Sequence, residues 1–163
     1  MDAPEGAKDI KDIKEIINMS KSGRYSADRK KIQAVGAAET LVVSVADCGT
    51  IFTMAGGAGA ASITLPSAAD AGPGWWCKFV LLANKASNDA TITAGVAGEL
   101  IVSNFGGLDK ADATANVVSA TGQDDIKFKD TALAGDQIEF ISTGSKMLCQ
   151  AFSAGDTADI VSS

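Results

Sequence analysis

Apolar residues alternate with polar ones along most of the chain after residue 35, and this period of two predicts β-strands. Clusters of Gly, Asp and Asn separate the runs, as between the strands of a sandwich or barrel. The most hydrophobic run, WWCKFVLL, is expected to be a central strand. About ten short strands favour an all-β fold, a compact β-sandwich or jelly-roll-like body of two sheets. The expected strands are Thr40–Ala46, Thr50–Ala55, Ser62–Leu65, Trp75–Leu82, Ala90–Ala94, Leu100–Phe105, Asn116–Ala120, Ile126–Lys129, Gln137–Ser142 and Lys146–Phe152.

Two connections between these strands carry a local signal. Thr143-Gly144-Ser145 joins two alternating runs and predicts a tight hairpin loop. The segment AGGAGAA at Ala55–Ala61 has no large side chain, so it is either a flexible loop or a tightly packed backbone crossing. The units TIFTMAGGAGAASITLP and ATITAGVAGELIVS share a strand–glycine–strand rhythm, without an exact internal repeat.

Residues 1–34 differ in composition from the body at 35–163 and are predicted to form an N-terminal arm. Four isoleucines at helical spacing place one apolar stripe on a short amphipathic helix over Lys8–Met19. A helix this short is marginal alone, so its stripe must dock on its own body or on another chain, and we favour another chain. The polar segment Ser20–Lys31 is expected to be a linker. The isoleucines of the stripe are Ile10, Ile13, Ile16 and Ile17.

Composition and charge exclude several classes of function. The chain has 163 residues and no histidine, so neither a Ser-His-Asp nor a Cys-His nucleophile system can form within it. The arm carries eight basic and six acidic residues, and the body six basic and fourteen acidic, which gives +2 and −8 and the total of −6. An acidic body argues against nucleic-acid binding. No apolar run is long enough to span a membrane.

Cysteines and acidic residues provide no recognisable site. Cys48, Cys77 and Cys149 are widely spaced and lie in or beside apolar runs, so we expect three buried free thiols. One polar stretch contains several aspartates but lacks the spacing of a calcium loop, and solvated turn carboxylates are expected. We therefore predict no enzyme activity, no cofactor and no metal. These aspartates are Asp109, Asp112, Asp124, Asp125 and Asp130.

The only two tryptophans are adjacent, at Trp75 and Trp76. Neighbouring residues of a strand face opposite sides, so one ring is expected to enter the core and the other to meet solvent, a second layer or a partner. An outward tryptophan suits an interface anchor or a sugar platform.

The stretch GTIFTMAGGAGAASITLPSAADAGPGWWCKFVLLAN (Gly49–Asn84), followed by ATITAG, resembles a pattern of bacteriophage virion proteins. The later strand pair within Gly135–Leu148 (GDQIEFISTGSKML) completes the resemblance, which covers Gly49–Phe152 and leaves the arm unmatched. Such modules occur in capsid decoration (cement) proteins and in tail fibres or adaptors. The resemblance implies a β-sandwich body, often a homotrimer, that binds a protein lattice and catalyses nothing.

From this resemblance we expect a head decoration protein, made in the host cytoplasm, that binds the major capsid protein on the virion surface. The isoleucine stripe and the basic linker would contact the shell, and the arm would bridge adjacent subunits. Two alternatives remain open: a tail adaptor or fibre-associated protein, and a carbohydrate-binding module that stacks sugars on a tryptophan and Tyr25. The expected contact residues are Ile10, Ile13, Ile16, Ile17, Arg24, Tyr25, Trp75 and Trp76.

Overall fold

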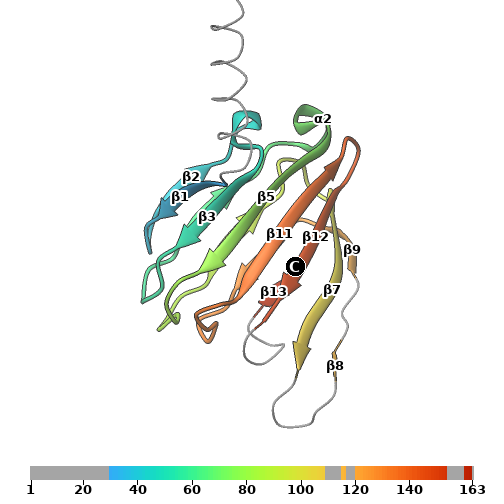
Figure 1. Ribbon diagram of the computed structural model, residues 1–163. Helices are drawn as coiled ribbons and strands as arrows, with labels where there is room; N and C mark the ends of the chain where they lie inside the picture. The colour runs from blue at the N-terminus through green and yellow to red at the C-terminus, as the bar shows by residue number, and fades with distance from the viewer. Residues whose placement is uncertain (1–29, 109–114, 117–119, 154–159, 163) are drawn as a thin grey trace, which may run out of the picture. The chain divides into compact units, whose positions relative to one another are not determined.

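A computed structural model describes residues 30–108, 115–116, 120–153 and 160–162 of the chain (Figure 1). The chain divides into two units, Met1–Lys31 and Ile32–Ser163, and nearly all described residues belong to the second. The expected arm helix, the linker up to Arg29 and the contact residues from Ile10 to Tyr25 lie outside the described residues. The predicted domain boundary after residue 34 falls within a strand, because Lys31–Val35 is the first strand of the body.

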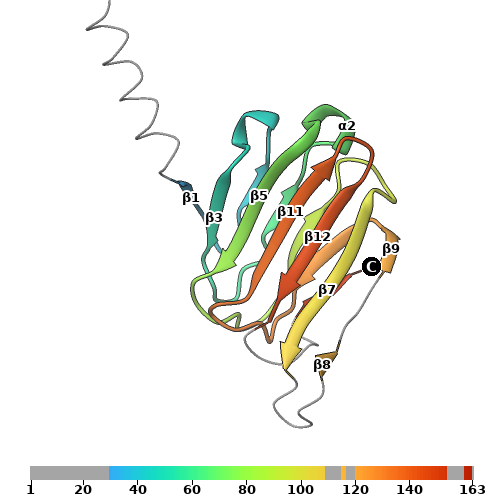
Figure 2. The same ribbon diagram turned by 45° about the vertical axis from the view of Figure 1, so that its right-hand side comes forward.

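Two packed β-sheets make up the described body, which confirms the predicted all-β fold (Figures 1 and 2). In the larger sheet the strands follow the order β1 (Lys31–Val35), β3 (Thr50–Met54), β5 (Pro73–Leu81), β11 (Gln137–Thr143), β12 (Met147–Phe152), β7 (Leu100–Leu108) and β8 (Ala115–Asn116), and β9 (Ala120–Gln123) also pairs with β7. In the smaller sheet the order is β13 (Ile160–Ser162), β10 (Asp125–Phe128), β6 (Ala90–Thr93), β4 (Ser62–Thr64) and β2 (Thr40–Val42).

From β1 to β7 the chain alternates between the two sheets, one strand at a time. Within this stretch, strands that become neighbours in a sheet run in the same direction: β3 pairs with β5, and β4 pairs with both β2 and β6, all in parallel. A jelly roll is built from antiparallel Greek keys, so its connectivity is not confirmed. Each segment that leads the chain from one sheet to the other is called a crossing here. The strand–glycine–strand rhythm of the sequence marks two crossings, from β3 to β4 and from β6 to β7.

Glycine permits the crossings to stack closely on one another. A Cβ atom at Gly56 would collide with the backbone carbonyl of Ala83, and one at Gly59 with that of Ala37. Gly57 N donates a hydrogen bond of 2.9 Å to Asn84 O, which ties the crossing to the next one along the stack. Of the two readings of Ala55–Ala61, the tightly packed backbone crossing is therefore the correct one.

One apolar core lies between the two sheets, and β5 shows how its pattern arises. Alternate residues of β5 are buried and half-buried, as expected for a strand with one face on a core. Phe79 stacks on Phe52 at a centroid distance of 4.8 Å and meets Phe140 edge-on at 5.9 Å. The smaller sheet closes this core with the buried side chains Ile63, Ile92, Ile126 and Phe128.

Several predicted elements are confirmed, with small shifts of their ends. The run WWCKFVLL forms the inner strand β5, flanked by β3 and β11. The hairpin at Thr143-Gly144-Ser145 joins the antiparallel strands β11 and β12, and Gly144 adopts φ +87°. The run Asn116–Ala120 was predicted as one strand, but Asn116 ends β8 and Ala120 begins β9, and residues 117–119 lie outside the described residues.

The predicted strand Thr40–Ala46 is wrong in its second half. Strand β2 ends at Val42, and Val45–Asp47 forms the 3₁₀ helix η1. The Asp47 carboxylate accepts hydrogen bonds from the backbone N–H and the hydroxyl of Ser44, at 2.9 and 2.8 Å. This local cap competes with strand extension, which explains why the β-branched run bends. A second short helix, α2 (Ala68–Ala71), was not predicted and is capped by Ser67.

Candidate protein-contact surface

The two tryptophans lie on opposite faces of β5, as the alternation of a strand predicts. Trp75 is only 3% exposed, and its Nε1–H donates a 3.0 Å hydrogen bond to the backbone carbonyl of Val45. Trp76 lies on the outer face of the larger sheet and is half-buried. The ring of Trp75 therefore belongs to the core, and Trp76 is the tryptophan that contributes to the surface.

Trp76 begins a line of apolar side chains that crosses four strands of the larger sheet. The backbone register places Trp76 opposite Ile141, Ile141 opposite Leu148, and Leu148 opposite Ile101. Their neighbours along each strand are buried in the core, so these four side chains share the outer face. We call Trp76, Ile141, Leu148 and Ile101 the apolar row. With a strand spacing of about 4.8 Å, the row is about 14 Å long.

The indole of Trp76 lies over Gly49 at one end of the row. Gly49 N donates a 2.8 Å hydrogen bond to the backbone carbonyl of Trp76, which continues the β3–β5 ladder. A Cβ atom at Gly49 would lie 3.7 Å from the ring of Trp76, so the indole extends over this position. The aromatic ring is thus held at a defined place on the sheet.

A polar line lies beside the apolar row. Two residues further along the strands, Lys78 is opposite Glu139, and Glu139 is opposite Gln150. Opposite charges at directly paired positions favour each other, and this line carries no net charge. An apolar strip with a polar border is the arrangement typical of a protein–protein contact.

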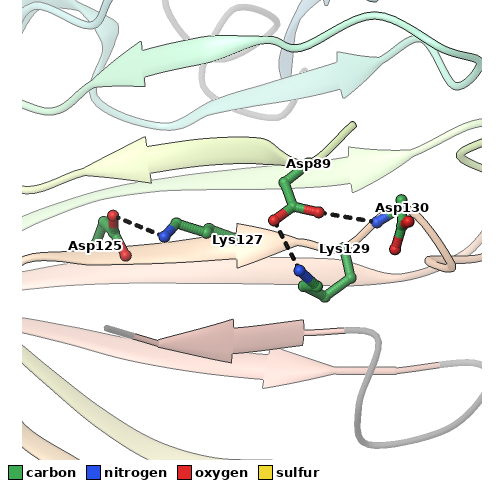
Figure 3. Close-up of polar contacts among 5 residues, drawn as sticks. All are labelled: Asp89, Asp125, Lys127, Lys129 and Asp130. Atoms are coloured by element: carbon green, nitrogen blue, oxygen red, sulfur yellow. Dashed lines mark hydrogen bonds and ion pairs between the residues drawn. The ribbon is translucent and has the colours of Figure 1, made fainter. Parts of the chain in front are cut away.

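Several aspartates in the described part of the body form local ion pairs or accept backbone hydrogen bonds (Figure 3). Asp89 forms an ion pair of 2.9 Å with Lys129, and its other oxygen accepts a 3.1 Å hydrogen bond from the backbone N–H of Asp130. The hydrogen bond to Asp89 raises the pKa of Lys129. Lys127 pairs with Asp125 at 3.3 Å.

Within the described residues, no group of three or more Asp, Glu or Cys side chains is arranged to hold a metal ion. Asp124 accepts a 2.6 Å hydrogen bond from Gly98 N, so this turn aspartate supports a loop. Asp109 and Asp112 lie outside the described residues.

The expectation of three buried thiols is wrong for Cys48, which is exposed at the end of η1. Cys77 and Cys149 are buried and free, as predicted. Burial raises the pKa of both thiols well above the ordinary value, since an apolar surrounding disfavours the thiolate. Cys48 differs because η1 turns the chain out of the smaller sheet just before it.

Lys85 was missed by sequence reasoning, although it is one of the few buried charged residues. Its Nζ donates a 2.5 Å hydrogen bond to the backbone carbonyl of Gly59, in the crossing stacked beside it. Burial lowers the pKa of Lys85, and the nearby Asp89 opposes this shift. A lone lysine between small residues gives no periodic signal, so only the packing of the crossings reveals its role.

No helix in the described part of the chain has the length and apolar composition needed to cross a membrane. No protein-family model matches the chain, and neither the curated proteins nor the solved structures contain a significant match. The apolar row is therefore the feature on which a function can be argued.

Proposed function

We propose that this chain is a non-catalytic structural protein of a bacteriophage virion that decorates the outer surface of the head shell. In this proposal it binds the major capsid protein as a homotrimer and stabilises the shell. The observation that supports it most directly is the apolar row with Trp76, on the outer face of a sheet whose inner face packs a continuous core.

A decoration protein needs a rigid body and an adhesive surface. The closely stacked crossings and the single core between the sheets provide a rigid body. The net negative charge of the body favours solubility at high copy number. A half-buried tryptophan beside aliphatic side chains suits the second, because tryptophan is enriched among the residues that contribute most to protein binding. Several weak contacts in one trimer would add as avidity.

The direct test is to locate the chain in the particle. Virions from the source culture are separated into heads and tails, and this polypeptide is quantified in each by mass spectrometry. We expect it with heads, at a copy number comparable to that of the shell protein. A handful of copies with tails would instead indicate an adaptor or fibre protein, and absence from both would refute a virion role.

Binding to heads then tests the surface itself. Trp76→Ala and Ile141→Glu are expected to lower head occupancy in the full chain. Thr64→Glu is the matched control, because Thr64 is exposed on the outer face of the smaller sheet. Equal occupancy of all three variants would contradict a role for the apolar row.

The arm is tested by deletion. Removing residues 1–29 spares β1 and is expected to leave a folded body that no longer binds heads. Full occupancy without the arm would refute its part in the proposal, including the contacts assigned to Arg24 and Tyr25.

A carbohydrate-binding module is the competing class. Trp76 is a possible sugar platform, but its partners along the row, Ile141 and Leu148, offer no hydrogen bonds to hydroxyl groups. A glycan array with the full chain separates the two classes: selective glycan binding that is lost in Trp76→Ala would favour the module.

A further inference from the structure

We propose that Lys78 and Glu139 fix the orientation in which the partner binds the apolar row, by pairing with one acidic and one basic side chain of the partner. The proposal rests on the proposed function and deepens it, because it names the chemistry of the shell surface. That surface carries an apolar strip, bordered by an acidic and a basic group in a defined order.

Charged residues are rare on this part of the larger sheet. Lys78 and Glu139 are the only charged residues in the strands β3, β5, β11, β12 and β7. Residues 35–163 as a whole carry six basic and fourteen acidic side chains. One lysine and one glutamate in five strands is therefore a local departure from the acidic composition of the body.

The strand register places both charges beside the apolar row. Lys78 follows Trp76 by two residues on β5, Glu139 precedes Ile141 by two residues on β11, and Lys78 is directly opposite Glu139. β5 and β11 are neighbours in the sheet (Figure 2). At about 3.4 Å per residue, the charges lie about 7 Å from the row. A partner that covers the row therefore also meets one positive and one negative group on adjacent strands.

Lys78 and Glu139 do not satisfy each other within the body. On the smaller sheet, Lys127 and Asp125 form an ion pair of 3.3 Å. Within the described part of the chain, neither Lys78 nor Glu139 forms an ion pair or a side-chain hydrogen bond, although both are half-buried. A half-buried charge has lost part of its hydration, so a group of opposite sign on a partner stabilises it.

The order of the two charges gives the contact a direction. Apolar contacts are non-directional, so the row alone accepts an apolar strip in two orientations that differ by half a turn. With an acidic group over Lys78 and a basic group over Glu139, only one orientation pairs both charges. The reversed orientation brings like charges together, which opposes binding.

The test exchanges the two charges. Heads that lack this chain are titrated with the full-length protein, and the bound chain is quantified by mass spectrometry. Lys78→Glu and Glu139→Lys are each expected to weaken binding by at least about tenfold, because each brings like charges together. The double exchange keeps the net charge but reverses the order, so we expect it to bind no better than the single variants.

Matched controls lie on the outer face of the smaller sheet. Lys127→Glu, Asp125→Lys and their double exchange change the net charge by the same amounts, and we expect them to bind as the wild type does. Urea unfolding of every variant separates a loss of binding from a loss of folding. Wild-type binding by the double exchange at Lys78 and Glu139 would overturn the proposal, and so would an equal loss of binding in the controls.

A second measurement removes the charges instead of reversing them. Lys78→Gln with Glu139→Gln keeps polar side chains of similar size. Between about 0.1 and 1 M salt the screening length falls from about 10 Å to about 3 Å, so the wild type is expected to lose at least about threefold more affinity than this variant. The same salt dependence in both proteins would overturn the proposal.

Failure of this inference is distinguishable from failure of the proposed function. If the wild type binds heads and the double exchange binds them equally well, the proposed function stands and the inference is wrong. If the wild type is absent from heads and does not bind them, the proposed function is refuted and the inference is refuted with it.

Discussion

Replacing each tryptophan in turn tests the orientation of β5, on which the apolar row depends. Trp75→Ala removes a core side chain that is 3% exposed and leaves a cavity, so it should lower the free energy of unfolding by about 3–5 kcal/mol. It also removes the hydrogen bond that the indole donates to the Val45 carbonyl. Trp76→Ala opens no closed cavity, because the ring lies on the outer face, and should cost about 1–2 kcal/mol.

The assay is urea unfolding followed by far-ultraviolet circular dichroism, whose signal does not depend on the tryptophan that is removed. Quenching by iodide in the paired Phe variants gives an independent readout. In Trp75→Phe the remaining ring is Trp76, and its emission should be quenched more strongly than that of Trp75 in Trp76→Phe. A larger loss of stability in Trp76→Ala than in Trp75→Ala would refute the orientation and, with it, the apolar row.

Three further predictions concern the crossings and the thiols. Gly59→Ala forces a Cβ atom into the Ala37 carbonyl and should lower the free energy of unfolding, measured with urea, by at least about 2 kcal/mol. Ala60→Ser should change this free energy by under about 0.5 kcal/mol. In the native chain only the thiol of Cys48 should react rapidly with a disulfide reagent at neutral pH, whereas all three thiols should react in denaturant. Rapid reaction of more than one thiol in the native chain would contradict the burial of Cys77 and Cys149. The pKa of Lys85 is lowered on folding from 10.5, so between its folded and unfolded values the unfolded chain binds more protons. The stability of the wild type relative to Lys85→Met should therefore rise with pH between these two pKa values, and thermal unfolding of both proteins over that pH range measures it. A difference in unfolding temperature that stays constant or falls with pH would show that burial does not disfavour the charged lysine.

Local pattern was sufficient to predict most strands, because a half-buried strand must alternate between core and solvent. The run Trp75–Leu82 and the hairpin at Gly144 are clear examples, since a long apolar run and a tight glycine turn each allow few other conformations. The pattern failed at Val45–Asp47, where a side-chain cap from Asp47 to Ser44 stops the strand. It also failed to include β1, whose residues follow a polar segment without a turn signal.

The alternation of apolar and polar residues along a strand predicts which side chains face the core, but it does not predict which of the two sheets the strand joins. The parallel pairing of β3 with β5 and of β4 with β6 depends on how the crossings stack. Gly59 packs against the backbone of Ala37, and Gly95 packs against the backbone of Pro66, so these contacts join segments distant in sequence. For the same reason, the exposure of Cys48 and the burial of Lys85 were not predictable.

The sequence by itself determined that the body is β-structured, that it has no histidine-based chemistry, and that one of two adjacent tryptophans faces outward. These follow from composition and from a period of two residues, both local properties of the chain. Only the tertiary structure decided that Trp76 is the outward one and that Ile141, Leu148 and Ile101 join it in a row. Register between strands brings these four residues together, and register is set by packing across the whole sheet.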